Sequence, residues 1–206
     1  EKVIVNAGST QFEADKVLCT VPLTVLNKIN FSPALSTEKQ SAMNGGFRYA
    51  PATRIYIQFK NRFWENESLN WWGNTDLPEE IWQPSWDMSG NTGILMSYLR
   101  WSAAEDMDIL NESDRNTAVL NRWENIFEGS INNFDSGVSK SWVLDEWSKG
   151  AWASPTTSQN ENLNDSISQV EGHIHFAGEH SSNDRGWMQG ALFSGLRAVS
   201  EIINTN

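Results

Sequence analysis

The chain has 206 residues, a length that allows one domain or two lobes with a sizeable core. Its 15 Lys and Arg residues stand against 26 Asp and Glu residues, which gives a net charge of −11. Such an acidic surface repels phosphate backbones, so nucleic acid is not expected as a partner. No apolar stretch approaches the roughly 20 residues of a membrane-spanning helix, so no membrane span is expected.

The first predicted elements are strands. Alternating apolar residues indicate a strand at Val3–Val5, and a second strand of the buried type covers Lys16–Val21 until Pro22 ends it. Thr53–Phe59 alternates between an apolar and a polar face, and Gly93–Leu99 has the pattern of a further strand. The chain therefore begins inside a sheet, which favours a fragment or a processed chain.

The middle of the chain alternates between elements and polar loops. A polar, tryptophan-rich loop is expected at Phe63–Trp86, and helical spacing of apolar residues predicts a helix at Asn116–Phe127. Ser141–Trp147 has the pattern of a strand. Ser154–Asn164 is rich in Ser, Thr, Asn and Gln, which is typical of a solvated loop. This order of strands and helices predicts an α/β or α+β fold.

The last forty residues carry the strongest pattern. A short strand at His173–Ala177 leads through the turn Gly178-Glu179 and a polar loop into an amphipathic helix at Gly186–Ile203. Small residues near the start of this helix would let the backbone approach a flat ligand closely. The expected buried side of the helix consists of Met188, Ala191, Leu192, Leu196, Val199 and Ile203.

Three segments near the end of the chain occur in a dense and ordered arrangement: His175–Glu179, Gly186–Ala191 and Ser194–Ala198. This arrangement resembles the C-terminal FAD-binding segment of the flavin-dependent amine oxidases. Thr75–Pro78 resembles the L-amino-acid oxidase branch in particular, and shorter matches occur at Ala14–Pro22, Phe31–Leu35 and Phe63–Glu65. The resemblance spans residues 14 to 202.

The resemblance implies a two-lobe fold, of which this chain is the C-terminal half. Residues 1–25 and 146–206 would belong to the FAD-binding domain, with the final helix on the flavin, and residues 26–145 would form a mixed-sheet substrate lobe. The sequence lacks the G-x-G-x-x-G turn that holds the pyrophosphate in such domains. An N-terminal half, from the same precursor or from a cleaved chain, is therefore the expected partner.

The resemblance also assigns a cofactor site. Glu179 would accept hydrogen bonds from the ribityl hydroxyls of FAD, as a carboxylate can. The helix opened by Gly186 would point the N–H of Met188 at the flavin C2 carbonyl, where its positive end favours negative charge. An exposed loop carboxylate and a plain packing helix are the alternatives. The full set of expected cofactor-binding residues is Gly178, Glu179, Gly186, Trp187, Met188 and Ala191.

Substrate would bind between two indoles, since Trp187 and Trp152 occupy the positions of the family's two cavity walls. Core packing is the alternative for Trp152. Arg54 stands where the family often has a lysine linked through a water to flavin N5, and is the candidate catalytic residue. Arginine keeps the charge but does not exchange protons near neutral pH, so a purely structural Arg54 is an equal alternative. The three histidines lack accompanying ligands, so no metal is expected.

The reaction implied is oxidation of an L-amino acid at the Cα–H by hydride transfer to the flavin. Hydrolysis of the imine gives a keto acid and ammonia, and O2 reoxidises the flavin to give hydrogen peroxide. A monoamine or polyamine oxidase acting on another amine is the alternative within the family. A binding module that stacks sugars on Trp71, Trp72, Trp82 and Trp86 is the third hypothesis. Four N-glycosylation triplets favour secretion slightly, and a homo-oligomer is left open.

Overall fold

The computed structural model describes residues 2–67, 72–75 and 79–204. The chain forms two compact units: unit 1 combines Glu1–Ala50 with Trp147–Asn206, and unit 2 is Pro51–Glu146. Residues 26–50, which the sequence assigned to the substrate lobe, thus belong to the same unit as residues 1–25. The roles of the two units in binding FAD and substrate stay predictions at this point.

Unit 2 contains a five-stranded sheet in the order β6-β7-β8-β5-β9, and every neighbouring pair is antiparallel. The strands are β5 (Ala52–Phe59), β6 (Trp72–Asn74), β7 (Glu79–Trp82), β8 (Gly93–Arg100) and β9 (Phe134–Ser141). The expected strands at 53–59 and 93–99 are confirmed as β5 and β8. The strand expected at 141–147 is wrong, because β9 ends at Ser141 where the chain turns away from β5.

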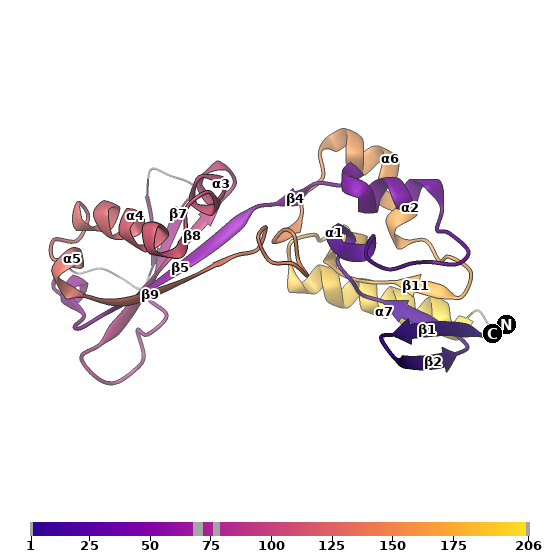
Figure 1. Ribbon diagram of the computed structural model, residues 1–206, viewed down its shortest axis with the longest axis horizontal. Helices are drawn as coiled ribbons and strands as arrows, with labels where there is room; N and C mark the ends of the chain where they lie inside the picture. Colours follow the sequence, from indigo (N-terminus) through magenta and orange to yellow (C-terminus); the bar gives the residue numbers. More distant parts are fainter. Residues whose placement is uncertain (1, 68–71, 76–78, 205–206) are drawn as a thin grey trace. The chain divides into compact units, whose positions relative to one another are not determined.

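The helices of unit 2 cover one face of this sheet (Figure 1). They are α3 (Ser102–Asp108), α4 (Glu112–Glu124), α5 (Ser130–Asn133) and the short 3₁₀ helix η2 (Phe63–Glu67). Ile55, Ile57 and Phe59 of β5 share a buried core with Val119 and Trp123 of α4. Helix α4 begins before the expected residue 116 because the Asn111 side chain accepts the backbone N–H of Asp114 as an N-cap.

The two ends of unit 2 lie side by side. Strands β5 and β9 pair with Thr53 opposite Ser141, and the N–H of Trp142 donates to the carbonyl of Ala52 at 3.1 Å. In unit 1, β4 (Tyr49–Ala50) likewise pairs with β10 (Trp152–Ala153). The segments through which the chain leaves and re-enters each unit are therefore neighbours within that unit.

Unit 1 joins the beginning and the end of the chain. β1 (Val3–Ala7) and β2 (Thr10–Ala14) form a hairpin, and β3 (Val17–Cys19) pairs in parallel with β11 (Ile174–Phe176). The expected strands at 16–21 and 173–177 thus lie in one sheet. The helices are α1 (Leu23–Leu26), α2 (Thr37–Ser41), η1 (Ala42–Gly46), α6 (Thr157–Ser168), η3 (Glu179–Ser181) and α7 (Met188–Asn204).

Helix α6 replaces the solvated loop that the composition indicated at 154–164. The side chain of Thr156 accepts the N–H of Gln159 and the side chain of Gln159 accepts the N–H of Thr156, which forms a capping box. Leu163 and Ile167 pack against the core of unit 1. The many Ser, Asn and Gln residues therefore form the exposed side of a helix.

Helix α7 buries the opposite side from the one expected. Its buried residues are the small Gly190, Ser194 and Ala198, whereas Leu192 is 67% exposed and Leu196 is 69% exposed. The helix lies so close to the preceding loop that a Cβ at Gly190 would overlap the carbonyl oxygen of Asp184. Close approach selects the small face, and the large apolar side chains are left on the surface of this chain. No helix among residues 2–67, 72–75 and 79–204 is long and apolar enough to cross a membrane.

Candidate functional site

The site is centred on the carboxylate of Glu179, at the start of η3. One oxygen (Oε1) accepts the backbone N–H of Ala153 at 3.0 Å, and the other (Oε2) accepts the N–H of Gly186 at 2.7 Å. A carboxylate has about four acceptor positions, so both oxygens can accept a further donor. Glu179 thereby connects β10, which carries Trp152, to the turn that carries Trp187.

Two glycines make this connection possible. Gly178 has φ +138° and Gly186 has φ +77°, backbone conformations that favour glycine. A Cβ at Gly178 would overlap the ring of His180, and one at Gly186 would lie 3.1 Å from Cδ1 of Trp152. Both positions are among the expected cofactor-binding residues, and the geometry shows why each is a glycine in this fold.

Trp152 packs against Gly186, so the structure brings three of the expected residues together: Trp152, Glu179 and Gly186. Trp187 follows Gly186 directly and is 71% exposed, and Met188 is 80% exposed. Ala191, one turn further along α7, is also exposed. Unpartnered large apolar side chains beside a helix N-terminus are typical of a binding surface.

Two polar side chains lie beside residues of the site: the buried His180 next to Gly178, and the half-buried Tyr49, the residue paired with Ala153. Burial, reinforced by the charges of Arg185 and Lys39, lowers the pKa of His180 to about 4, so His180 is neutral at neutral pH. Burial, followed by the negative charge of Glu179, raises the pKa of the Tyr49 hydroxyl. The sequence weighed His180 only as a metal ligand and did not single out Tyr49, because the surroundings of both side chains are set by the fold.

Arg54 belongs to unit 2, on the face of β5 that the helices do not cover. Its guanidinium lies over the ring of Tyr98, 4.6 Å from the centroid, and its buried Nε has no hydrogen-bond partner among the described residues. Burial pulls the pKa of Arg54 down, but the side chains of Tyr56 and Tyr98 outweigh this and raise it. Arg54 is therefore a permanent cation. It lines a cavity of about 310 Å³ with Tyr56, Trp82, Gln83, Pro84, Trp86 and Met96.

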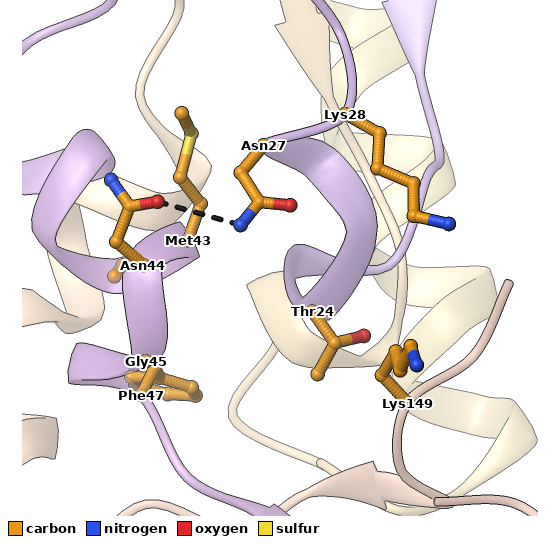
Figure 2. Close-up of a pocket in the computed structure, with 9 residues that line it drawn as sticks. Thr24, Asn27, Lys28, Met43, Asn44, Gly45, Phe47 and Lys149 are labelled. Atoms are coloured by element: carbon orange, nitrogen blue, oxygen red, sulfur yellow. Dashed lines mark hydrogen bonds between the residues drawn. The ribbon is translucent and has the colours of Figure 1, made fainter. Parts of the chain in front are cut away.

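A second cavity, of about 440 Å³, lies in unit 1 between α1, η1 and the turn at Lys149. Figure 2 shows the Asn27 and Asn44 side chains meeting across it, joined by a hydrogen bond of 3.4 Å. Lys28 and Lys149 also line it. None of the residues expected to bind FAD or substrate lines this cavity, so it is not part of the site at Glu179.

The described residues contain no group of three or more His, Cys, Asp or Glu side chains that could hold a metal ion. His175 is buried, and its Nδ1 lies 3.3 Å from a carboxylate oxygen of Glu201. His180 is buried beside Gly178. These two histidines are thus accounted for by packing and by a polar side-chain contact.

The residues around Glu179 fit one edge of a flavin cofactor. They offer a carboxylate for hydroxyl groups, the positive end of a 17-residue helix for an electron-rich carbonyl, and an exposed indole for a flat ring. Gly178 and Gly186 keep the backbone free of side chains beside these groups. No residue in this set requires a metal.

A family model and named relatives agree on the family. The model of the flavin containing amine oxidoreductases matches residues 1–203. A putative L-amino-acid oxidase of Bacillus subtilis is 34% identical over 96% of this chain and 42% of its own length. An L-amino-acid oxidase of Siganus canaliculatus is 31% identical over 96% of this chain and 38% of its own length. A flavin-dependent L-tryptophan oxidase of Lentzea aerocolonigenes is 28% identical over 95% of this chain and 43% of its own length.

Solved structures show the same fold. A triple mutant of putrescine oxidase matches 100% of this chain and 46% of its own chain, with a TM-score of 0.87 at 18% identity. Cyclohexylamine oxidase from Brevibacterium oxydans matches 99% of this chain and 46% of its own chain, with a TM-score of 0.83 at 18% identity. These likenesses confirm the expected α/β amine oxidase fold. The chain spans less than half the length of the relatives it matches, and it belongs to the flavin-containing amine oxidoreductases, a family of FAD-dependent enzymes.

Proposed function

We propose that this chain is the C-terminal portion of an FAD-dependent L-amino-acid oxidase. The whole enzyme would convert an L-amino acid, O2 and water into a keto acid, ammonia and hydrogen peroxide. The observation that carries the proposal is the Glu179 carboxylate, which joins Ala153 and Gly186 beside the exposed Trp187. Relatives that bear the name L-amino-acid oxidase, at 34% and 31% identity, support this substrate class.

Each residue of the site has a proposed role toward the cofactor. Glu179 accepts the ribityl hydroxyls, and Gly178 and Gly186 admit the cofactor to the backbone. The amino-terminal turn of α7, with Met188 and Ala191, faces the flavin carbonyl edge. When bound, FAD supplies the acceptor for the two electrons that leave the substrate.

Trp187 and Trp152 are the proposed walls of the substrate cavity. Their indoles orient the amine and exclude water from the reacting carbon. Arg54, a permanent cation, is proposed to stabilise negative charge that develops during the reaction with O2, without transferring a proton itself.

The remainder of the enzyme is the proposed partner of α7. The exposed side chains of Leu192, Leu196 and Ile203 form an apolar stripe on this helix. A stripe of this kind needs a cover, and the relatives contain more than half their length outside the matched region. We propose that this outer segment covers α7 and carries the glycine-rich turn for the pyrophosphate. Because the sequence contains N-glycosylation triplets, we favour a secreted location for the whole enzyme.

Peroxide release by the complete, FAD-loaded enzyme tests the substrate class. We expect turnover of at least one L-amino acid and none of spermine or benzylamine. Oxidation of either amine, with none of any L-amino acid, would assign the enzyme to the monoamine or polyamine oxidases. Thr75–Pro78, which favours the L-amino-acid oxidase branch, lies outside the described residues except for Thr75, so the assay has to decide.

The sugar-binding alternative gains no support from the structure. The rings of Trp72 and Trp82 meet edge to face, with centroids 6.3 Å apart and an interplanar angle of 71°. Two rings in this arrangement do not offer one flat stacking platform. Trp86 lines the cavity beside Arg54, and Trp71 lies outside the described residues.

A further inference from the structure

The loop between η3 and α7 carries the functional groups of the site but has little regular structure of its own. It contains Gly186, whose N–H binds Glu179, and Trp187. Within the loop, the N–H of Asp184 donates to the hydroxyl oxygen of Ser182 at 3.1 Å. A loop held only by such short-range bonds would move easily, so its position depends on a longer contact.

The side chain of Arg185 makes that contact. Its Nη1 donates to Oδ1 of Asn160 at 3.0 Å, and its Nη2 donates to Oδ1 of Asn164. Both asparagines belong to α6, where a spacing of four residues puts them on the same face one turn apart. The Nε of Arg185 donates to the carbonyl of His180 at 3.3 Å, which closes the loop on itself.

The planar guanidinium suits this arrangement better than any other side chain. It offers several N–H groups in a fixed fork, so one residue can bind two amide oxygens and a carbonyl at once. The guanidinium also lies over the ring of Phe47, 5.4 Å from the centroid. Burial lowers the pKa of Arg185, and the nearby charge of Glu179 opposes this change.

We propose that Arg185 is a positioning residue, which fixes the Gly186–Trp187 segment and the Glu179 carboxylate by anchoring their loop to α6. This inference rests on the proposed function, since it concerns the same site. Arg185 precedes Gly186 directly, so a shift of its side chain moves the N–H that Glu179 accepts and the indole that follows. Asn160 and Asn164 are the other half of the anchor and touch neither Glu179 nor Trp187 in any described hydrogen bond.

The test compares variants of the complete, FAD-loaded enzyme. Arg185→Lys keeps the charge but loses the fork, and the pair Asn160→Ala with Asn164→Ala removes the acceptors on α6. Asn162→Ala is the matched control, because Asn162 is on the same helix but donates to Ser158 instead. For each variant, kcat and KM are measured per bound flavin, together with the visible circular dichroism of the flavin.

We expect kcat/KM per bound flavin to fall about tenfold or more for Arg185→Lys and for the asparagine pair, since small displacements of a cavity wall are costly. The circular dichroism of the flavin should change in both. Combining the two changes should add little, because they break one network. The Asn162→Ala enzyme should match the parent.

The proposal is overturned if Arg185→Lys and the asparagine pair lower the melting temperature alone and leave kcat, KM and the flavin dichroism unchanged. It is also overturned if the combined variant shows the full product of the two separate losses. An enzyme that binds FAD but oxidises no L-amino acid would contradict the proposed substrate class. In that case the flavin dichroism of the same variants still decides the role of Arg185.

Discussion

Both carboxylate oxygens of Glu179 accept backbone N–H groups, one from the segment of Trp152 and one from the segment of Trp187. A single side chain therefore holds together the part of the site assigned to FAD and the part assigned to substrate. Glu179 contacts both parts of the site. The side chain of Trp187, in contrast, is exposed on the surface of this chain. Changes at these two residues should therefore have different consequences.

Replacing Glu179 by Ala leaves the N–H groups of Ala153 and Gly186 without their acceptor, at a cost of about 1 to 3 kcal/mol each where water cannot replace it. We expect weaker FAD retention together with lower turnover per bound flavin. Trp187→Ala should keep its flavin and lose kcat/KM alone. Flavin absorbance per protein, measured beside turnover, separates the two. Loss of flavin by the Trp187 variant and retention by the Glu179 variant would reverse the assignment.

His180 predicts how the site responds to acid. Its folded-state pKa of about 4 lies below the ordinary value of 6.5, so the unfolded chain binds the proton more readily. Stability from neutral His180 is complete above pH 6.5 and is lost as pH falls toward 4. The parent should lose about 2 kcal/mol more than His180→Phe between pH 7 and pH 5. Denaturation at both pH values checks this, and parallel losses in the two proteins would contradict it.

The family resemblance singled out Glu179, Gly186 and Trp187 as candidates, because they follow one another within a single ordered stretch of sequence. Arg185 and His180 could not be found in this way. The role of Arg185 depends on Asn160 and Asn164, which belong to a segment whose composition indicates a loop. The role of His180 depends on its burial beside Gly178, which no local pattern reports.

Among the elements, α7 and α6 show where periodicity is informative. The apolar pattern of α7 correctly gave a helix, but it could not say whether the partner of the apolar stripe lies in this chain. The strands β5 and β8 were found because alternation over eight residues is specific. Helix α6 was missed because its stability comes from the cap and from contacts with the core rather than from a long apolar stripe.

The apolar stripe of α7 makes Leu196 a test of its partner. Within this chain Leu196 is 69% exposed, so its contacts here predict little loss of stability on replacement by Ala. If the outer segment covers α7, the complete enzyme should lose about 2 kcal/mol or more. Thermal and urea unfolding of the complete enzyme measure the loss, with the exposed Ser200→Ala as the control. If the Leu196 and Ser200 variants were equally stable, the proposal that the outer segment covers α7 would be wrong.

At the scale of the whole molecule, cofactor binding should require both halves of the enzyme. This chain carries the residues proposed for the flavin and the ribityl chain, whereas no segment of it has the glycine-rich pattern for the pyrophosphate. We expect the 206-residue chain to emerge from gel filtration without visible flavin absorbance. The same sequence joined to the outer segment should retain FAD. Stable, stoichiometric FAD on the shorter chain would contradict the proposed division of the site.

Because its two ends are neighbours, unit 2 has the properties of an inserted domain that can be exchanged as a whole. The unit begins and finishes on adjacent strands, with Ala52 bonded to Trp142, and the host segments around it pair through Ala50 and Trp152. An insert whose termini already meet can be exchanged without a bridging linker or a rearranged host. Recombination at the junctions 50/51 and 146/147 would then transfer the sheet with Arg54 between relatives while the groups around Glu179 stay unchanged. The cavity lined by Arg54 would thus be inherited separately from Glu179 and from the two indoles of Trp152 and Trp187.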